Sequence, residues 1–551
     1  MATLSENNAA AQLTDHLSDQ LKQGFEKSAV VLSAQAVRDA ERHWASNNNN
    51  STWPLMVKAA SSFVQRFEAA FNASQSILVV VGQGNNGGDG YYIAKLLLQQ
   101  GKNVVVYAPF GAPKAGIDAQ QAMNEFLAAG GRVRANATSL AASTAASTTA
   151  ASTTAAIATA ASTTAAIATA AIATAAIATS ESYPIIIDAL FGSGLSRTLS
   201  AAAIEVINYI NHSSGQVYAV DVPSGLNADS GQPEPVCVHA SATHSFIAYK
   251  PGLLTAYGPA SCGELSLDTL ELEPIASTTK ENWRYDPRVN KLPSRTGNTH
   301  KSHHGNVGVI AGLGNMAGAG IIASRAALNA GAGRVYLQCE PSHFVACLSQ
   351  SPEIMFSETT DNTLQQNAVL VVGPGLGRGP QAQQIMQTIL TLQANSGVDN
   401  KRSLGVLDAD GLRYLAKQPQ MVAHWVLTPH EAEAADLLGI SADEVTNDRL
   451  AAALALHKKY KAVVVLKGAG TLVAHQGGVN FCHSGSAAMA TAGMGDCLAG
   501  IIAALIAQGL SAEDAAITGV NWHATLGHQL AQTQRIVLAS DICEQLKLSC
   551  D

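Results

Sequence analysis

A short segment near the C-terminus combines residue types that could bind an anion and move a proton. Residues 491–500 read TAGMGDCLAG, so Gly493 and Gly495 immediately precede Asp496. The glycines allow backbone N–H groups to converge on an anion, and the adjacent carboxylate is a candidate base. The same pattern also fits a glycine-rich turn that leads into a buried helix, so the rest of the chain must decide between the two.

The residues after this segment predict the helix that would position it. Apolar side chains recur at helical spacing from Leu498 to Ile506, and no proline occurs before Gly509. A helix that begins here would present unpaired N–H groups and the positive end of its dipole to an anion. We therefore predict an anion-binding helix start with Asp496 beside it.

A second glycine-rich segment lies in the first half of the chain. Residues 77–81 are apolar and mostly β-branched, which predicts a strand buried on both faces, and residues 82–90 read GQGNNGGDG. A helix is expected from Ile93 onward. Strand, glycine-rich turn and helix in this order can cradle phosphate. Because the turn is also rich in Asn and Asp, we predict a ligand-binding loop rather than a merely structural turn.

Two further predicted strands of the first half end in polar groups. One leads into Asp188, and the other leads into Asp221 and Ser224. Ligands bind at the carboxyl ends of the strands in an open parallel sheet, so we expect these side chains to converge with Asn86. One such carboxylate could be a helix cap, but three polar strand ends favour a site. Oxygen ligands suit a hard cation, and a monovalent ion would be a reasonable occupant.

The second half repeats the alternation of strands and helices, and its polar groups again follow strands. Lys467 stands on a glycine-rich turn that ends in Thr471, which suits phosphate contact although the spacing is not that of a Walker P-loop. A lone histidine such as His430 is more often a capping residue than a catalyst, so we predict only binding for it. The polar segments are GPGLGR (373–378), DADG (408–411), TPHEAE (428–433) and KGAGT (467–471).

Composition limits the class of protein. The chain has 551 residues and a formal net charge of −8, which predicts two domains and argues against general nucleic-acid binding. Its 8 cysteines include no CxxC pair and no zinc-type spacing, which indicates a reducing compartment. We find no signal peptide and no apolar run long enough to span a membrane. A soluble, cytoplasmic protein is expected.

Changes in composition along the chain predict its domain organisation. Residues 135–179 are almost entirely Ala, Ser, Thr and Ile, and the ten residues from 151 are repeated from 161, so this segment is interpreted as a low-complexity surface insertion. A polar stretch with several prolines predicts a boundary near residue 280. The predicted α/β domains are 28–278 and 285–548. Helices expected outside the motifs include 28–45, 55–71 and 321–330.

These motifs resemble two known families. The first half, with GQGNNGGDG, DALFGSGLSRT and DVPSGL, resembles the YjeF N-terminal family, the epimerases of hydrated NADH and NADPH. The second half, with GPGLGR, DADGL, LTPHEAE, KGAGT and TAGMGDCLAG, is similar to the ADP-dependent dehydratases of the same hydrates, which are ribokinase-like. The order resembles that of bacterial bifunctional repair proteins. The resemblance implies an N-terminal Rossmann-like α/β/α sandwich and a C-terminal ribokinase-like α/β/α domain.

In the first domain the resemblance implies a nucleotide site and a potassium site. Asp221 would be the catalytic residue, and Asn86, Asp188 and Ser224 would hold the potassium ion. The residues implied to contact the hydrated nucleotide are Asn85, Asn86, Gly87, Gly88, Asp89, Gly192, Ser193, Gly194, Leu195, Ser196, Arg197, Thr198 and Asp221.

In the second domain the resemblance implies that Asp496 is the base and contacts the hydrate, with ADP as co-substrate. The other residues implied to contact the hydrate are Gly375, Gly377, His430, Glu431, Glu433 and Asp436. Those implied to contact the adenine nucleotide are Lys467, Gly468, Ala469, Gly470, Thr471, Ser486, Ala492, Gly493, Met494 and Gly495. Magnesium is also expected, but the usual Asn-x-x-Glu of ribokinase-like kinases is HEAE here, which leaves its ligands open.

The function implied by the resemblance is repair of hydrated NADH and NADPH. The first domain would interconvert the R and S hydrates, and the second would dehydrate the S form with ADP, giving AMP and phosphate. One alternative is a small-molecule kinase of the hydroxyethylthiazole kinase type fused to a nucleotide-binding module, and another is a non-enzymatic nucleotide sensor. We expect small-molecule substrates, no nucleic-acid or membrane partner, and a homo-oligomer.

Overall fold

The computed structural model divides the chain into two compact units, Val30–Glu281 and the residues from Asn282 onward. This division supports the predicted boundary near residue 280, while the domain limits 28–278 and 285–548 stay a prediction. The low-complexity segment lies, apart from its first residue, outside the described residues. The structure describes residues 28–74, 76–135, 183–195, 198–272, 282–289, 292–313, 316–357, 368–395 and 404–548.

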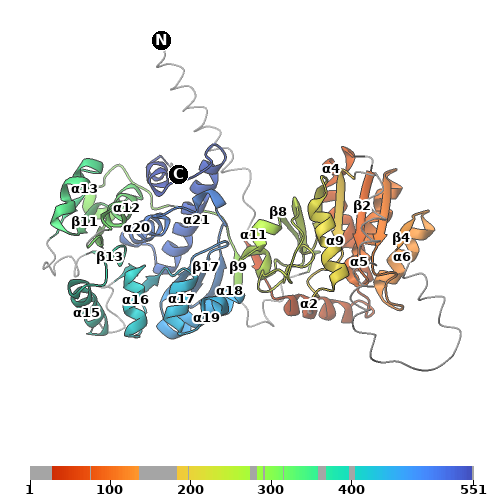
Figure 1. Ribbon diagram of the computed structural model, residues 1–551, viewed down its shortest axis with the longest axis horizontal. Helices are drawn as coiled ribbons and strands as arrows, with labels where there is room; N and C mark the ends of the chain where they lie inside the picture. Colours follow the sequence, from red (N-terminus) through yellow and green to blue (C-terminus); the bar gives the residue numbers. More distant parts are fainter. Residues whose placement is uncertain are drawn as a thin grey trace, which may run out of the picture. The chain divides into compact units, whose positions relative to one another are not determined.

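A parallel sheet forms the centre of the first unit, and its described strands follow the order β4-β3-β2-β5-β6-β7-β8 (Figure 1). The chain first builds β2 to β4 toward one edge and then adds β5 to β8 on the other side of β2. The order therefore reverses between β2 and β5, which is where doubly wound sheets bind ligands. The strands are β2 (Ser76–Val81), β3 (Asn103–Ala108), β4 (Val133–Ala135), β5 (Ile185–Ala189), β6 (Gln216–Val220), β7 (Ala242–Phe246) and β8 (Glu264–Asp268).

Helices cover both faces of this sheet, which confirms the predicted α/β class. One face packs against α3 (Trp53–Arg66), α5 (Asn85–Gln99) and α6 (Asp118–Ala128), and the other against α9 (Ala201–His212). The remaining described elements of this unit are β1 (Ala29–Val31), α2 (Ala34–Ser46), α4 (Glu68–Asn72), α10 (Pro251–Leu254) and α11 (Gly258–Ser261).

Two predicted helices of this unit are wrong in part. The helix expected at 28–45 begins only at Ala34, because the β-branched residues before it form β1 and the Ser33 side chain caps the helix by accepting from the Ala36 N–H. The helix expected at 55–71 is interrupted at Phe67, which separates α3 from α4.

The second unit also has a mostly parallel sheet, with the order β9-β18-β17-β16-β15-β14-β13-β10-β11-β12. Its order reverses between β10 and β13, and β17 pairs antiparallel with both of its neighbours. The strands are β9 (Trp283–Tyr285), β10 (Asn306–Ile310), β11 (Arg334–Gln338), β12 (Met355–Phe356), β13 (Val369–Val372), β14 (Gly405–Leu407), β15 (Trp425–Leu427), β16 (Val463–Leu466), β17 (Leu472–His475) and β18 (Gly478–Phe481).

Helices again lie on both sides of this sheet (Figure 1). The hydrophobic core of one face is formed with α12 (Ala317–Asn329), α20 (Met494–Ala507), α21 (Ala512–Ala531) and α22 (Ala539–Leu546). The helix predicted at 321–330 therefore begins four residues earlier, and the helix predicted after Gly495 is confirmed. The other described helices are α13 (Phe344–Gln350), α15 (Pro380–Asn395), α16 (Asp410–Lys417), α17 (Glu431–Leu438), α18 (Ala442–Asn447) and α19 (Arg449–Tyr460), with short 3₁₀ turns at Lys301–His304, Pro341–His343 and Ala487–Met489.

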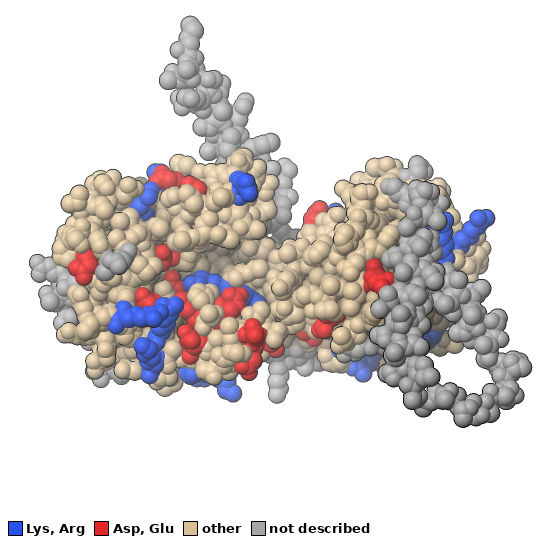
Figure 2. Space-filling view, in the orientation of Figure 1, with Lys and Arg blue, Asp and Glu red and all other residues tan. Residues whose placement is uncertain are grey.

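The surface carries charges of both signs. On the face drawn in Figure 2, acidic and basic side chains are intermingled rather than gathered into a stripe of one sign. No helix in the described part of the chain is long and apolar enough to cross a membrane. The described cysteines are all free thiols.

The α12–α20 contact predicts how two glycines of the second unit respond to substitution. A Cβ at Gly500, on α20, would lie 2.2 Å from the Ala323 carbonyl oxygen of α12, whereas a Cβ at Gly318 would meet nothing within 4 Å. We expect Gly500→Ala to lower the free energy of unfolding by about 1–3 kcal/mol through overpacking. Gly318→Ala should be neutral or stabilise by about 0.5–1 kcal/mol. Denaturant unfolding measures both, and equal effects would contradict the close helix contact.

Candidate functional site

The first candidate site is built from the carboxyl ends of β5 and β6. Asp188 is completely buried, and both of its carboxylate oxygens bond to Ser224: the Ser224 hydroxyl donates to Oδ1 at 2.5 Å and its N–H to Oδ2 at 2.8 Å. Burial raises the pKa of Asp188 to about 6. No ion pair in the described residues includes Asp188, so its negative charge has no cationic side chain opposite it.

Asn86 joins this pair from the start of α5. Its side chain lies against Gly192, where a Cβ would be 3.0 Å from the Asn86 Oδ1, and its buried amide nitrogen has no hydrogen-bond partner. Amide oxygen and nitrogen exchange places by a simple flip, which would present an acceptor instead. The three side chains can thus supply carboxylate, hydroxyl and amide oxygens, a donor set that fits a potassium ion.

Asp221 follows β6 in a strained conformation. Its φ is +67°, and the Val222 N–H bonds to the Val220 carbonyl at 2.8 Å, which forms a three-residue turn. A positive φ is uncommon for a residue other than glycine and is often associated with functional sites. The turn directs the carboxylate toward the glycine-rich segment after β5, where the Ser193 N–H donates to Oδ2 at 3.4 Å.

Two charged residues near Asp221, Glu41 and Lys250, were not predicted from the sequence. Lys250 forms a buried ion pair with Asp221. Burial, together with the charge of Asp221, raises the pKa of Glu41 on α2 and raises that of Asp89 on α5 well above its usual range. Nothing in the sequence signalled Glu41 or Lys250, because neither lies in a glycine-rich motif.

The segment 82–90 is not the loop that its glycines predicted. The helix α5 begins at Asn85, so Asn85, Asn86 and Asp89 lie in its first turns. Gly88 and Gly90 permit close packing, since a Cβ would lie 2.8 Å from the Ala119 Cα and 2.5 Å from the Ala189 Cβ, respectively. These glycines are therefore explained by packing of the helix against α6 and the sheet.

The other residues predicted to contact the nucleotide differ in burial and in their hydrogen bonds. The Ser193 carbonyl accepts from Arg38 at 3.4 Å. Gly194 and Thr198 are exposed, while Gly192 and Leu195 are half-buried. Gly87 is buried against Gly82. Ser196 and Arg197 lie outside the described residues.

The second candidate site lies where α20 begins. Gly493 caps the helix with φ +90°, and Asp496 is in its first turn beside Met494 and Gly495. Burial raises the pKa of Asp496 to about 7, the charges of Asp408 and Glu433 add to this increase, and Lys467 opposes it. A carboxylate that titrates near neutral pH can serve as a general base.

A lysine–carboxylate group faces the start of α20. Lys467, after β16, donates to Asp408 Oδ1 at 2.7 Å and lies 3.9 Å from Glu433 Oε2. A Cβ at Gly495 would be 3.1 Å from Lys467 Nζ and 3.4 Å from Asp408 Oδ2, so these groups adjoin the helix start. Asp408 was not predicted as a site residue, although its position at a strand end in the DADG segment was a usable signal.

Two residues predicted to contact the hydrate also have partners within the protein. His430 is the N-cap of α17: its Nδ1 accepts from the Ala432 and Glu433 N–H groups, and Glu433 Oε2 accepts from the His430 N–H. Glu431 pairs with the buried Arg449, which also donates to the Lys467 carbonyl at 3.1 Å. Asp436 is exposed.

The glycine-rich turns of this unit hold unusual backbone conformations. Gly375, Gly377 and Gly468 have φ values of +56°, +80° and +141°. The Gly377 N–H donates to Asp410 Oδ2 at 2.9 Å, and the Thr471 hydroxyl donates to the Gly468 carbonyl at 3.2 Å. The other predicted nucleotide contacts are Ala469 and Gly470 on the turn after β16, Ser486 capping the 3₁₀ turn at Ala487–Met489, and the exposed Ala492 before α20.

The residues of the second unit do not fit a magnesium ion held by protein ligands alone. Within the described residues no group of three His, Cys, Asp or Glu side chains could hold a metal ion. The carboxylates of Asp408 and Glu433 already face the Lys467 ammonium, at 2.7 and 3.9 Å.

Family comparisons cover both units. Residues 53–252 match the family described as YjeF-related protein N-terminus, and residues 307–548 match the family described as NAD(P)H-hydrate dehydratase. The bifunctional NAD(P)H-hydrate repair enzyme Nnr of Coxiella burnetii is 34% identical over 94% of this chain and 99% of its own length. The chain belongs to the bifunctional NAD(P)H-hydrate repair enzyme family. The Escherichia coli relative of the same name is 33% identical over 94% of this chain and 93% of its own length.

Solved structures similar to this chain correspond to one half of it. A ribokinase-like superfamily protein from Enterococcus faecalis is 27% identical, with a TM-score of 0.45, and the match covers 48% of this chain and 94% of that protein. The ADP/ATP-dependent NAD(P)H-hydrate dehydratase of Bacillus subtilis, co-crystallised with ATP/Mg²⁺, is 24% identical, with a TM-score of 0.41 and coverage of 46% and 93%.

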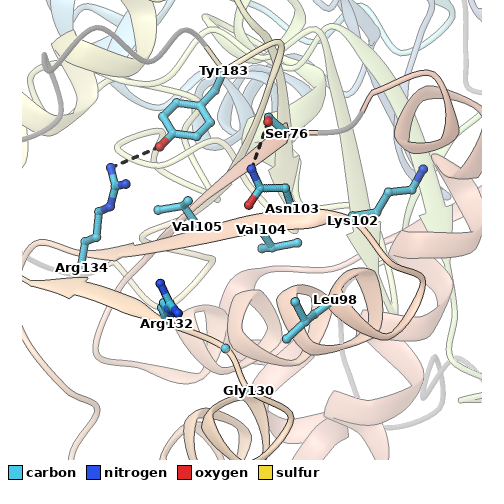
Figure 3. Close-up of a pocket in the computed structure, with 11 residues that line it drawn as sticks. Ser76, Leu98, Lys102, Asn103, Val104, Val105, Gly130, Arg132, Arg134 and Tyr183 are labelled. Carbon is cyan, nitrogen blue, oxygen red and sulfur yellow. Dashed lines mark hydrogen bonds between the residues drawn. The ribbon is translucent and has the colours of Figure 1, made fainter.

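A cavity of about 520 Å³ lies elsewhere in this repair-family chain (Figure 3). Its lining includes Ser76 and Asn103, the first residues of β2 and β3, together with Arg132 and Arg134. It therefore lies at the amino ends of these strands, whereas Asp188 and Asp221 lie at or near carboxyl ends. We do not assign the substrate to this cavity, because open parallel sheets bind ligands at the carboxyl edge.

The raised pKa of Asp496 predicts a pH-dependent stability difference. The folded protein retains a proton on Asp496 up to about pH 7, whereas an unfolded chain loses it near the ordinary pKa of 3.8, so this residue's contribution to stability is lost as pH rises between those values. We expect Asp496→Asn to be more stable than the parent at pH 8, by on the order of 2 kcal/mol after allowance for solvent screening, and to gain little at pH 4. Denaturant unfolding across this range measures the difference. The exposed Asp436→Asn is the control, and a flat difference for Asp496→Asn would contradict the assignment.

Proposed function

We propose that this chain repairs hydrated NADH and NADPH with two separate sites. The first unit would interconvert the R and S hydrates, and the second would dehydrate the S hydrate with ADP, giving AMP and phosphate. The observation that carries the proposal is the pairing of Asp496, a carboxylate with a pKa near neutrality, with the N–H groups at the start of α20. Family membership over nearly the whole chain supports the two activities together.

The proposed dehydration uses Asp496 and the start of α20 in turn. The C6 hydroxyl of the hydrate is a poor leaving group, and phosphorylation makes its departure easy. Asp496 would take the hydroxyl proton as the oxygen attacks the terminal phosphoryl group of ADP, while AMP leaves. The N–H groups near Gly493 to Gly495 would stabilise the charge on the moving phosphoryl group. Phosphate then leaves C6 and a proton leaves C5, which restores the ring double bond.

The proposed epimerisation inverts C6, which carries both a hydroxyl group and the ring nitrogen. Transfer of the hydroxyl proton to the ring nitrogen breaks the C6–N bond and leaves a planar aldehyde carbon. The nitrogen then adds back to either face of this carbon as the proton returns to the oxygen. Asp221 is the proposed proton-transfer group, and the first turns of α5 together with the segment 192–198 are the proposed contacts of the nucleotide. The Ser193 N–H on Asp221 Oδ2 supports this placement.

We further propose that Asn86, Asp188 and Ser224 hold potassium, which would supply positive charge beside an anionic nucleotide. The buried carboxylate of Asp188 without a cationic partner supports this proposal. The second unit is proposed to use an adenine nucleotide, and we derive no step through magnesium because its residues do not fit a dedicated site. A cytoplasmic homo-oligomer without nucleic-acid or membrane partners remains our proposal, supported by the net charge of −8.

A direct assay tests the proposal against its rivals. Hydrated NADH is incubated with the protein and ADP, and the return of absorbance at the reduced-nicotinamide wavelength is followed. Recovery is expected with the hydrate and ADP together. A kinase of the hydroxyethylthiazole type or a nucleotide sensor would give no recovery with either ADP or ATP.

Two matched substitutions should separate the activities. Asp496→Asn should lower dehydration by at least about 100-fold while epimerisation persists, because it removes the base of one unit only. Asp221→Asn should do the reverse. Epimerisation is measured without ADP by separating the R and S hydrates, and dehydration is measured with pure S hydrate. Loss of both activities in either folded variant would contradict two independent sites.

The potassium proposal predicts a specific change in thermal stability. A cation that binds the folded state raises the unfolding temperature with its concentration. We expect potassium to raise the unfolding temperature of the first unit more than tetramethylammonium does at equal ionic strength. Asp188→Asn should remove the difference, whereas the exposed Asp39→Asn should keep it. An equal response to both cations would refute a potassium site at Asp188.

A further inference from the structure

Lys250 is buried in the first unit and has no donor left for a ligand. Its side chain has 0% exposure, and its ammonium donates to Asp221 Oδ1, to the Ser245 hydroxyl at 3.1 Å and to the Phe246 carbonyl at 2.9 Å. An ammonium group has three N–H donors, so all of them are used. A direct contact with substrate is therefore excluded in this arrangement, and Lys250 acts through its partners.

The two carboxylate oxygens of Asp221 have different hydrogen-bond partners. Oδ1 accepts from Lys250, and the Ser245 hydroxyl and the Phe246 N–H lie 3.4 Å from it. Oδ2 accepts only one described hydrogen bond, from the Ser193 N–H in the segment after β5. The lysine thus fixes which oxygen is tied to the interior and which faces the proposed substrate contacts.

Lys250 also balances several negative charges. Glu41 from α2, Asp89 from α5 and Asp118 from α6 surround Asp221 or its neighbours, while Arg38 from α2 adds positive charge. His244 of β7 is also near Asp221 and Lys250, but burial lowers its pKa to about 4, so it is neutral at pH 7. Because like charges repel one another, the close ammonium of Lys250 offsets part of the repulsion within this group of carboxyl side chains.

We propose that Lys250 is a positioning residue of the epimerase site, whose buried ammonium holds Oδ1 of Asp221 and presents Oδ2 to the substrate. This inference rests on the proposed role of Asp221. It assigns no covalent step to Lys250. The strained turn at Asp221 fits this role, since the ion pair and the Ser193 contact hold the carboxylate from opposite sides.

The test compares Lys250→Met with Lys58→Met in the full chain. Methionine keeps the approximate length without the charge, and Lys58 is a partly exposed lysine of the same unit that pairs with exposed Glu271. For Lys250→Met we expect kcat of epimerisation to fall by about 100-fold with little change in KM. The acid limb of the pH–rate profile should move upward by at least about one pH unit, because the base loses its cation. Lys58→Met should change neither quantity.

Additional variants keep the result interpretable. Dehydration by the second unit reports whether each variant is a functional chain, and circular dichroism reports whether the first unit is folded. If Lys250→Met fails to fold, Ser245→Ala, which removes one acceptor of the ammonium, should give a smaller shift of the acid limb in the same direction. Lys250→Arg should restore part of the rate, since it keeps the charge.

The outcomes separate this inference from the function on which it rests. Epimerisation that survives Asp221→Asn would refute the proposed role of Asp221. A second outcome is that epimerisation is lost in Asp221→Asn but keeps its rate and pH profile in folded Lys250→Met or in Ser245→Ala. This outcome would overturn only the role of Lys250. A lower rate with an unmoved acid limb would also overturn it, because that result indicates a merely structural role.

Discussion

Both candidate sites depend on where one lysine ammonium lies among several carboxylates. In the first unit Lys250 pairs directly with Asp221. In the second, Lys467 pairs with Asp408, and burial raises the pKa of Asp496 to about 7, with a further increase from the charges of Asp408 and Glu433. Charges that are partly removed from water interact more strongly than charges at the surface. The lysine ammonium therefore pairs with one carboxylate in each site, while in the second unit a different carboxylate, that of Asp496, can exchange a proton near neutral pH.

Both sheets position these charged residues through a similar strand order. Each sheet reverses its strand order, and polar side chains follow the carboxyl ends of its strands, after β5 and β6 in the first unit and after β14 to β16 in the second. The backbone is strained at both places, since Asp221 and Ala409 have φ values of +67° and +47°. Such conformations persist only when the surrounding structure holds them. At Asp221 the ion pair with Lys250 contributes to that support.

Much of this arrangement could be predicted from sequence, and the exceptions have physical causes. A strand buried on both faces gives a continuous run of apolar, mostly β-branched residues, and such runs identified β2 and β5. Apolar residues at helical spacing identified α20. The strand β7 was missed because its Thr243, His244 and Ser245 are polar although buried. Their polarity is offset by specific partners, such as the Cys262 carbonyl, which accepts from the Thr243 hydroxyl at 2.7 Å. Because such partners are not adjacent in the sequence, the roles of Ser245 and Lys250 could not be predicted.

The placement of Asp496 could be predicted more fully than its chemistry. Glycine spacing predicted the helix start and the adjacent carboxylate, both of which the structure contains. The raised pKa could not be predicted, because it depends on burial and on Asp408 and Glu433, which lie more than sixty positions away in the sequence. In the HEAE segment His430 caps a helix, and its contact with the hydrate stays a prediction.

The early start of α5 has a consequence for interpreting substitution tolerance. Gly88 and Gly90 are fixed by close packing, whereas Asp89 between them lies in the charged group around Asp221. A saturation scan of this segment would find three adjacent intolerant positions. The two glycines would fail through loss of folded protein, and the aspartate through loss of turnover in protein that still accumulates. Measuring both the amount of folded protein and the activity of each variant would therefore separate a constraint on folding from a constraint on catalysis within one apparent motif.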